Sequence, residues 1–188
     1  CLRTLRAETG IRYDERSKGT LQLFRKQMQL DHVGGDIEVL RQYGVPYDVL
    51  DREGCIDAEP GLAAVRERFV GGLRLPDDET GDCHMFTQRL EELTAAQGVT
   101  FSYGTTIQSV DVSGDRVAQV STNRGAFKAD RYVMALGSFS PLLLRPIGID
   151  IPVYPVKGYS LTVPIVNADV APESTIMDET YKVAITRL

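Results

Sequence analysis

The fold of this chain is decided by the stretch Tyr132-Val133-Met134-Ala135-Leu136-Gly137-Ser138. A short, largely apolar run that leads directly into glycine and serine is typical of a buried strand that ends in a tight turn. In open α/β sheets, ligands bind beyond the carboxyl ends of such strands. The stretch therefore predicts a buried strand over 131–136, with a ligand close to Gly137.

A second informative segment, Pro152-Val153-Tyr154-Pro155-Val156-Lys157-Gly158-Tyr159-Ser160, follows shortly afterwards. Proline fixes its own backbone and favours extended structure in the residue before it. The segment therefore predicts a stiff crossing that leads into a new strand over 153–163. We expect another strand over 181–187.

The rest of the chain alternates between helical and extended patterns. Alternating apolar residues predict a hairpin over 11–24. A helix over 26–43 is expected to break at Gly34-Gly35, with Asp36 capping its second piece. Apolar residues at helical spacing predict the clearest helix over 84–97. Other predicted elements are a helical turn at 51–62 and strands at 47–50, 69–75, 99–103, 107–112, 116–122 and 126–128.

Composition narrows the class of protein. The net charge is −5, from 21 basic and 26 acidic side chains, and no basic stripe suggests a nucleic-acid partner. No run approaches the roughly 20 apolar residues of a membrane-spanning helix. The three cysteines lack metal-binding spacing and do not indicate a disulfide framework, which favours a reducing compartment.

Few residues stand out as catalytic by pattern. His32 and His84 are isolated histidines, for which structural roles are expected, with His84 at the start of the best helix. The loop Asp77-Asp78-Glu79 is interpreted as solvated rather than as a metal site, and no metal is predicted. Arg3, Arg6, Arg12 and Arg16 are expected on a solvated face. Catalytic residues stay unassigned.

The two informative segments together resemble the middle of an FAD-dependent enzyme of the D-amino-acid oxidase superfamily. Asp78–Cys83, Val153–Thr162 and Asp178–Arg187 are similar, in particular, to bacterial D-amino-acid dehydrogenases of the small-subunit type. A dinucleotide-binding loop of the GxGxxG type is absent from the sequence. That absence, together with a first residue other than methionine, predicts an interior part of a longer enzyme.

The resemblance implies a mixed α/β fold of two interleaved domains. Residues 77–150 would form part of an FAD-binding Rossmann-like domain that lacks the GxGxxG loop. Residues 1–76 and 151–188 would form two parts of a mostly antiparallel substrate-binding domain.

Five positions match elements that contact FAD in the superfamily. Ile107 corresponds to a strand residue that pairs with the adenine, and Ala135, Gly137 and Ser138 correspond to the turn beside the pyrophosphate and ribose. Gly158 corresponds to a backbone position close to the flavin ring. Without the resemblance, these residues are interpreted as an ordinary buried strand residue and ordinary turn residues.

Three further positions match the substrate side of the site. Lys157 would place a positive charge near the flavin or the substrate carboxylate, and Tyr159 and Tyr181 would offer aromatic contacts and hydroxyl groups. A solvated lysine and interior tyrosines are the alternatives. Arg187 is not assigned as the carboxylate-binding arginine.

The implied activity is oxidation of a D-amino acid, such as D-alanine, to a 2-oxo acid and ammonium. Hydride passes to FAD and electrons continue to a respiratory acceptor such as a quinone. The alternatives are another flavin amine oxidoreductase, similar to glycine or sarcosine oxidase, and a substrate-domain fragment without activity. The resemblance also implies a cytoplasmic location, with peripheral contact between the full-length enzyme and the inner membrane.

Overall fold

The computed structural model describes residues 2–187, which form two compact units. One unit contains the residues up to 99 and those from 163 onward, and the other contains residues 100–162. The chain thus leaves the first unit, builds the second and returns. The mixed α/β class is confirmed. The functional domain boundaries at 76 and 150 stay predictions.

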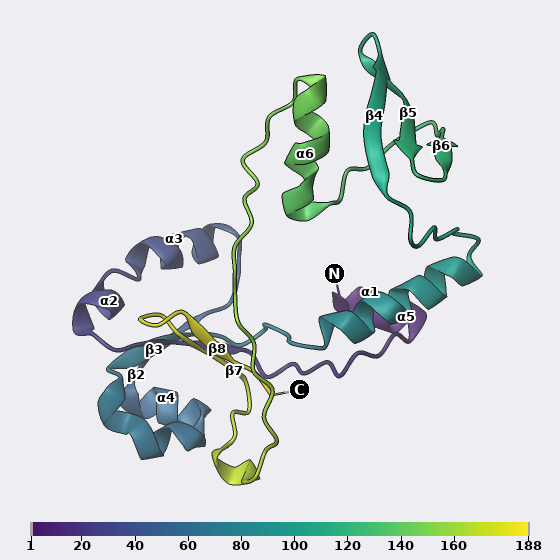
Figure 1. The fold of residues 1–188 in the computed structure, drawn as a ribbon. Helices are drawn as coiled ribbons and strands as arrows, with labels where there is room; N and C mark the ends of the chain where they lie inside the picture. The colour runs from purple at the N-terminus through teal and green to yellow at the C-terminus, as the bar shows by residue number, and fades with distance from the viewer. Residues whose placement is uncertain (1, 188) are drawn as a thin grey trace. The chain divides into compact units, whose positions relative to one another are not determined.

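The first unit is built around a five-stranded sheet with the order β2-β3-β1-β7-β8 (Figure 1). Strand β1 (Thr20–Phe24) lies in the middle, antiparallel to β3 (Gly71–Leu75) and parallel to β7 (Thr175–Asp178). Strands β2 (Asp48–Asp51) and β8 (Val183–Ile185) form the two edges. The sheet therefore joins segments from both ends of the chain.

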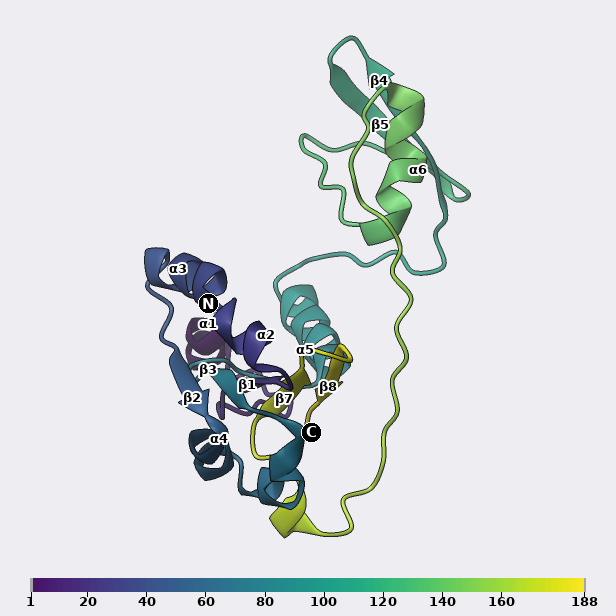
Figure 2. The same ribbon diagram turned by 90° about the vertical axis from the view of Figure 1, so that its left-hand side faces the viewer.

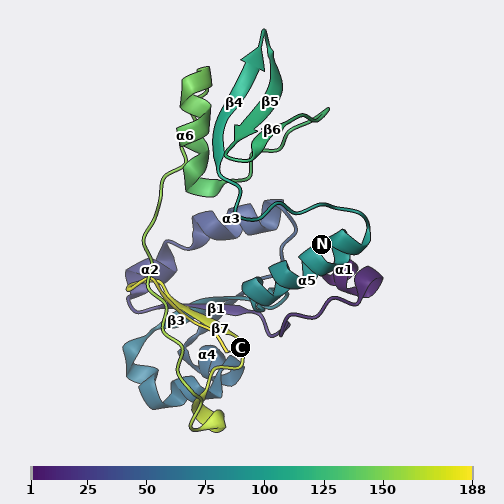
Figure 3. The same cartoon turned by 45° about the vertical axis from the view of Figure 1, so that its right-hand side comes forward.

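Helices cover both faces of this sheet (Figure 3). Helices α2 (Gln27–Asp31) and α3 (Gly34–Gln42) lie on one face. Helix α4 (Arg52–Ala58) and the 3-10 segment η1 (Pro60–Arg68) lie on the other. The predicted helix over 26–43 is interrupted, but at His32-Val33 rather than at the paired glycines, which form the first residues of α3.

The alternation of side chains along β1 divides the core in two. Leu21 and Leu23 pack against Cys55 of α4, whereas Phe24 packs on the opposite face. Gly72, opposite Leu23 in the register, is needed because a Cβ there would lie 2.7 Å from the Gln22 carbonyl oxygen and 3.1 Å from Cys55 Sγ. Close packing of α4 on the sheet therefore depends on a missing side chain.

Two local predictions in this unit are wrong. Residues 11–24 do not form a hairpin, because β1 finds its partners far along the chain in β3 and β7. Arg16 instead forms an isolated bridge with Thr80. The N-cap of α3 is Val33. Asp36 does not cap the helix but lies within its first turn.

The second unit contains a three-stranded antiparallel sheet with the order β4-β5-β6. Its strands are β4 (Ile107–Ser113), β5 (Arg116–Thr122) and β6 (Gly125–Phe127), as predicted from the turns between them. Helix α6 (Ser140–Leu144) lies beside β4 (Figure 2). The remaining short segments are η2 (Gly137–Phe139), η3 (Arg145–Ile147) and η4 (Ala168–Val170), the last in the first unit.

Three predicted strands, at 99–103, 131–136 and 153–163, are irregular in the structure. Val133, in the stretch expected to be most buried, is 89% exposed. The apolar pattern is that of a buried strand, but among residues 2–187 no strand lies beside it to complete the hydrogen-bonding ladder. An apolar run alone does not make a strand.

The N-terminal helix α1 (Leu2–Thr9) is held by ion pairs rather than by a buried apolar face. Arg3 Nε and Arg6 Nη1 lie 2.6 and 2.7 Å from the carboxylate of Glu79, whose side chain is only 9% exposed. The interpretation as solvated is therefore wrong for Glu79 and for Arg6, whereas the Asp77 side chain is 63% exposed. The sequence could not show that the two segments meet.

A buried carboxylate fastens the returning chain to the first unit. Glu59, 2% exposed, accepts hydrogen bonds from the backbone N–H groups of Glu173 (2.9 Å) and Ser174 (2.6 Å). These two donors directly precede β7. Glu59 therefore fixes where β7 enters the sheet beside β1.

Replacing Glu59 tests this connection. We expect Glu59→Ala to lower the free energy of unfolding by about 3 kcal/mol, because one buried and one partly buried N–H group lose their charged acceptor. Urea unfolding measures the loss. Glu67→Ala, at an exposed carboxylate in η1, the 3-10 segment that follows Glu59, should change stability by less than about 0.5 kcal/mol. Equal effects of the two substitutions would contradict the role of Glu59.

The Glu79 cluster predicts a pH dependence. Hydrogen bonds from Arg6, joined by those from Arg3 and Ser17, outweigh the opposing effect of burial and lower the pKa of Glu79 from 4.5 to about 2. Because the folded pKa lies below the unfolded value, ionised Glu79 stabilises the fold fully above about pH 4.5 and loses this contribution as the pH falls toward 2.

The measurement is the difference in melting temperature between the wild type and Glu79→Gln. We expect this difference to be largest near pH 7 and to shrink progressively between about pH 5 and pH 2. Glu92→Gln, at a carboxylate that is 64% exposed, is the control and should show little difference at any pH. A constant difference for Glu79→Gln across this range would be evidence against the pKa assignment.

Candidate functional site

The turn predicted to approach the cofactor begins a short 3-10 segment. Gly137 has φ +53°, and a Cβ built there would meet nothing within 4 Å. Positive φ is easily reached only by glycine. Ala135 precedes the turn and Ser138 lies within it, both exposed. The turn therefore combines a glycine conformation with open space, as a close approach to a ligand requires.

Ile107 begins strand β4, which lies at the edge of its sheet. The ladder of β4 runs to β5 only, so along the described chain its other edge has no strand partner. The Ile107 side chain is 37% exposed, and the residue is strand-forming as predicted but not buried. Backbone groups at an unpaired edge are available to a planar hydrogen-bonding ligand.

The segment that carries Lys157, Gly158 and Tyr159 is extended but unpaired. Lys157 Nζ lies 5.2 Å from the centroid of the Tyr159 ring, within the range of a cation–π contact. The Tyr159 side chain is 89% exposed, and Gly158 has open space where a Cβ would be. The structure thus brings Lys157 and Tyr159 together and leaves both accessible.

Tyr181 lies in the turn between β7 and β8 and belongs to the first unit. The Arg25 guanidinium carbon lies 4.8 Å from its ring centroid, and Arg25 also pairs with Asp178. No sequence pattern selects Arg25 or Asp178 as a pair, since they are 153 residues apart and meet only because β1 and β7 are neighbours.

The eight predicted site residues divide between the two units. Tyr181 lies in the first unit, and the other seven are in the second: Ile107, Ala135, Gly137, Ser138, Lys157, Gly158 and Tyr159. Their roles toward a cofactor or substrate stay predictions.

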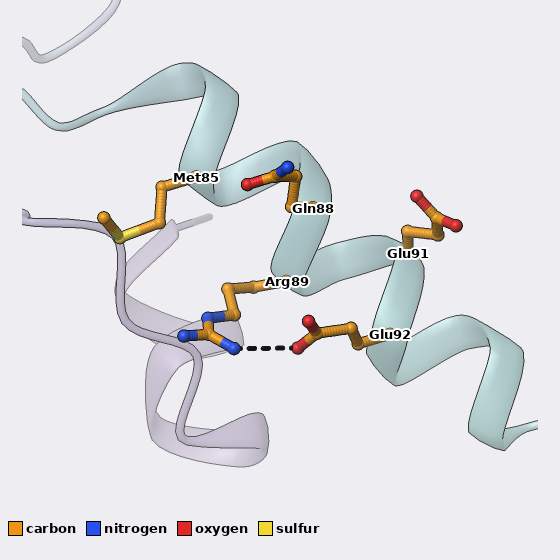
Figure 4. A pocket seen from close by; sticks show the side chains of 5 residues that line it. All are labelled: Met85, Gln88, Arg89, Glu91 and Glu92. Atoms are coloured by element: carbon orange, nitrogen blue, oxygen red, sulfur yellow. Dashed lines mark hydrogen bonds and ion pairs between the residues drawn. The ribbon is translucent and has the colours of Figure 1, made fainter.

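Two hollows on the surface are lined by other residues than the predicted site residues. One of about 410 Å³ is lined from a single helix, α5 (Cys83–Ala96), by the side chains drawn in Figure 4, with Arg89 Nη1 3.0 Å from Glu92. A second of similar volume lies between α5 and residues 9–12. Both are open and bordered by the charged side chains Arg89 and Glu92, and neither contains a predicted site residue.

Other reactive side chains have structural roles. His84 follows the N-cap Asp82, whose carboxylate accepts its backbone N–H, which confirms the expected place at the helix start. Burial, with a smaller effect from Asp51, raises the pKa of the Cys55 thiol to about 11. Within residues 2–187 there is no group of three or more potential metal ligands. Nor does any helix in that range have the length and apolar character to cross a membrane.

The residues present fit part of an FAD site. A positive-φ glycine with open space and an unpaired strand edge can accept the dinucleotide portion of a flavin cofactor. The phosphate-binding GxGxxG loop is not in this sequence. In such a site these residues would supply supporting contacts, and the principal phosphate contacts would come from elsewhere.

Comparison with known proteins extends this assignment. A D-amino acid dehydrogenase of Rhodopseudomonas palustris (strain HaA2) is 74% identical over all 188 residues, and one of Bradyrhizobium diazoefficiens is 64% identical. The chain covers 44% and 45% of these relatives, so it spans less than half of their length.

Solved structures share the fold at lower sequence identity. L-proline dehydrogenase from P. horikoshii superimposes with a TM-score of 0.79 at 17% identity, over 99% of this chain and 49% of that one. Glycine oxidase from Bacillus cereus gives 0.73 at 22% identity, over 98% and 49%. The model of the FAD dependent oxidoreductase family (DAO) matches residues 1–188. The chain therefore belongs to the FAD dependent oxidoreductase family.

Proposed function

We propose that the full-length protein is an FAD-dependent D-amino-acid dehydrogenase. It converts D-amino acids such as D-alanine to 2-oxo acids and ammonium. The observation that carries this proposal is the 74% identity, across every residue of the chain, to a protein with that name. Electrons pass to a respiratory acceptor such as a quinone, and the enzyme works in the cytoplasm, peripherally at the inner membrane.

The cofactor would be held in part by the second unit. Bound FAD supplies the hydride acceptor. The backbone of Ile107 would pair with the adenine, and Gly137, with Ala135 and Ser138 beside it, would let the chain approach the ribose and pyrophosphate. Gly158 would allow the same close approach near the flavin ring. These roles are supported by the open strand edge and by the positive φ of Gly137.

The substrate would be oriented by cationic and aromatic side chains. Lys157 would attract the substrate carboxylate, since its side chain is positively charged and exposed. Tyr159 and Tyr181 would bound the space for the substrate side chain and offer hydroxyl groups to its polar atoms. These residues would hold Cα–H in place, which is the protein's part in a flavin-dependent oxidation.

The stereochemistry of the reaction provides the direct test. We expect full-length protein to carry bound flavin, and its absorbance to bleach without oxygen on addition of D-alanine but not of L-alanine. A water-soluble quinone should then restore the absorbance. Reoxidation by oxygen as fast as by the quinone would instead indicate an oxidase.

The alternatives give distinct outcomes in the same assay. Bleaching by glycine or sarcosine, but by neither alanine isomer, would assign the protein to the amine oxidases. Full-length protein without flavin would contradict the cofactor assignment. A reaction with L-alanine at equal rate would contradict the substrate class.

A matched glycine pair tests the proposed approach of the cofactor. Gly137 and Gly148 both have positive φ, +53° and +81°, and both have open space at the Cβ position. Alanine at either site carries a backbone penalty of about 1–2 kcal/mol. We expect Gly137→Ala to reduce the FAD content of the full-length protein and Gly148→Ala to leave it unchanged, measured as the ratio of flavin to protein absorbance. Equal flavin contents would exclude a close approach at Gly137.

A further inference from the structure

The turn between β7 and β8 is held in place by side chains from the end of β1 and the start of α2. Gln22 Nε2 donates to Glu179 at 2.7 Å, and the Glu179 backbone N–H donates to the Leu23 carbonyl oxygen at 3.2 Å. Thr180 Oγ1 donates to Gln29 Oε1 at 3.1 Å. Two successive residues of the turn, Glu179 and Thr180, are thus hydrogen-bonded to β1 and α2.

Arg25 makes the contact that reaches the aromatic ring. Its Nε and Nη2 atoms both lie 2.7 Å from Asp178 Oδ2, and its guanidinium carbon lies 4.8 Å from the Tyr181 ring centroid. A planar guanidinium can satisfy a carboxylate in its plane while an aromatic ring lies against its face. Arg25 therefore fixes Asp178 and Tyr181 with the same group.

Asp178 completes the arrangement from the other side. Its second oxygen, Oδ1, accepts the backbone N–H groups of Thr180 (2.9 Å) and Tyr181 (3.2 Å). Partial burial would raise the pKa of Asp178, but the hydrogen bonds from Arg25 and from Tyr181 more than offset this and lower it. The carboxylate stays ionised at neutral pH and ties the turn backbone to Arg25.

The turn needs this support because its backbone is constrained. Lys182, directly after Tyr181, has φ +53°, a conformation that costs a non-glycine residue energy. The ion pair of Lys182 with Glu179 lies in the same turn. Tyr181 itself is 66% exposed, so the part of its ring not covered by Arg25 is accessible. An exposed ring whose position is fixed is suited to contact a ligand.

We propose that Arg25 is a positioning residue for substrate binding, which holds Tyr181 in place through the shared contact with Asp178. This inference rests on the proposed function, in which Tyr181 bounds the substrate space. Arg25 does not itself touch the substrate. The positive charge of Arg25 is paired with Asp178, and its contacts limit the movement of the Tyr181 ring and of the turn.

The experiment uses the full-length flavoprotein with D-alanine as substrate. We expect Arg25→Gln to raise KM about tenfold while kcat changes by less than about twofold. The cation–π contact and the charged hydrogen bond that hold Tyr181 in place are lost, so the ring must be ordered when substrate binds. Arg25→Lys should recover part of the loss, since it keeps the charge but not the planar fork. Arg89→Gln, at an exposed ion pair on α5, is the control and should leave both constants unchanged.

A double-substitution cycle separates positioning from general structural support. In the Tyr181→Ala background, Arg25→Gln should raise KM no further, because the ring it positions is gone. Hydrogen exchange gives a second measurement, independent of activity: the Thr180 and Tyr181 amides should exchange faster in Arg25→Gln than in the wild type. If Arg25→Gln fails to retain flavin, Asp178→Asn, which keeps the side-chain shape, is measured in its place.

The results separate the positioning role of Arg25 from the proposed function of the protein. An unchanged KM in Arg25→Gln, or additive effects in the cycle, would overturn the positioning role while D-alanine oxidation by the wild type still supports the proposed function. An unchanged KM in Tyr181→Ala would overturn both the role of Tyr181 and the inference built on it. Failure of the wild type to oxidise any D-amino acid would overturn the proposed function and the substrate role of Arg25, and hydrogen exchange would still report whether Arg25 orders the turn.

Discussion

The parallel pairing of β1 with β7 is the interaction on which the first unit depends. It places Thr20 opposite Thr175 and Leu23 opposite Asp178, and so joins two segments that the whole second unit separates in sequence. With β3 on the other side, β1 is hydrogen-bonded along both edges, and its side chains reach the core on both faces. The strand is thus the centre of the sheet and of both hydrophobic clusters.

Polar contacts determine how the returning chain joins that centre. Glu59 binds the backbone just before β7, and the side chains of Gln22, Arg25 and Gln29 bind the turn just after it. A hydrophobic pattern fixes which face of a strand is buried, but a shift by two residues keeps that face, so the pattern alone leaves more than one register open. Buried and half-buried hydrogen bonds select one register, because an incorrect register would leave charged acceptors without donors.

Much of the local structure could be predicted from the sequence. The helix over 84–97 and the three strands of the second unit follow from apolar periodicity and turn residues, and these predictions are confirmed. The helix over 26–43 is also interrupted, but at His32-Val33, just before the glycines at which the break is predicted. The strand predictions that are wrong depended on partners far away in sequence. The segment 131–136 has the composition of a strand but no neighbouring strand among residues 2–187, and β1 pairs with β7 rather than with residues 11–16.

Contacts between residues far apart in sequence also limit the prediction of the candidate site. Lys157 and Tyr159 are close in sequence, so local reasoning could associate them, and the structure shows their contact. Tyr181 was selected through a resemblance, but Arg25 and Asp178 became visible only once strand order was known. Positions that act through sheet neighbours carry no local pattern in the sequence.

The position of β7 after the second unit in the sequence also bears on the order of folding. During synthesis from the N-terminus, β1 can pair with β3 early, whereas its other edge must stay open until β7 has emerged, after the entire second unit. Closing so long a loop has an entropic cost and slows the formation of such contacts. Until then the exposed edge of β1 can pair with other chains. The central sheet is therefore completed only after the second unit has been synthesised, and a protein stopped before β7 would be expected to aggregate rather than to fold.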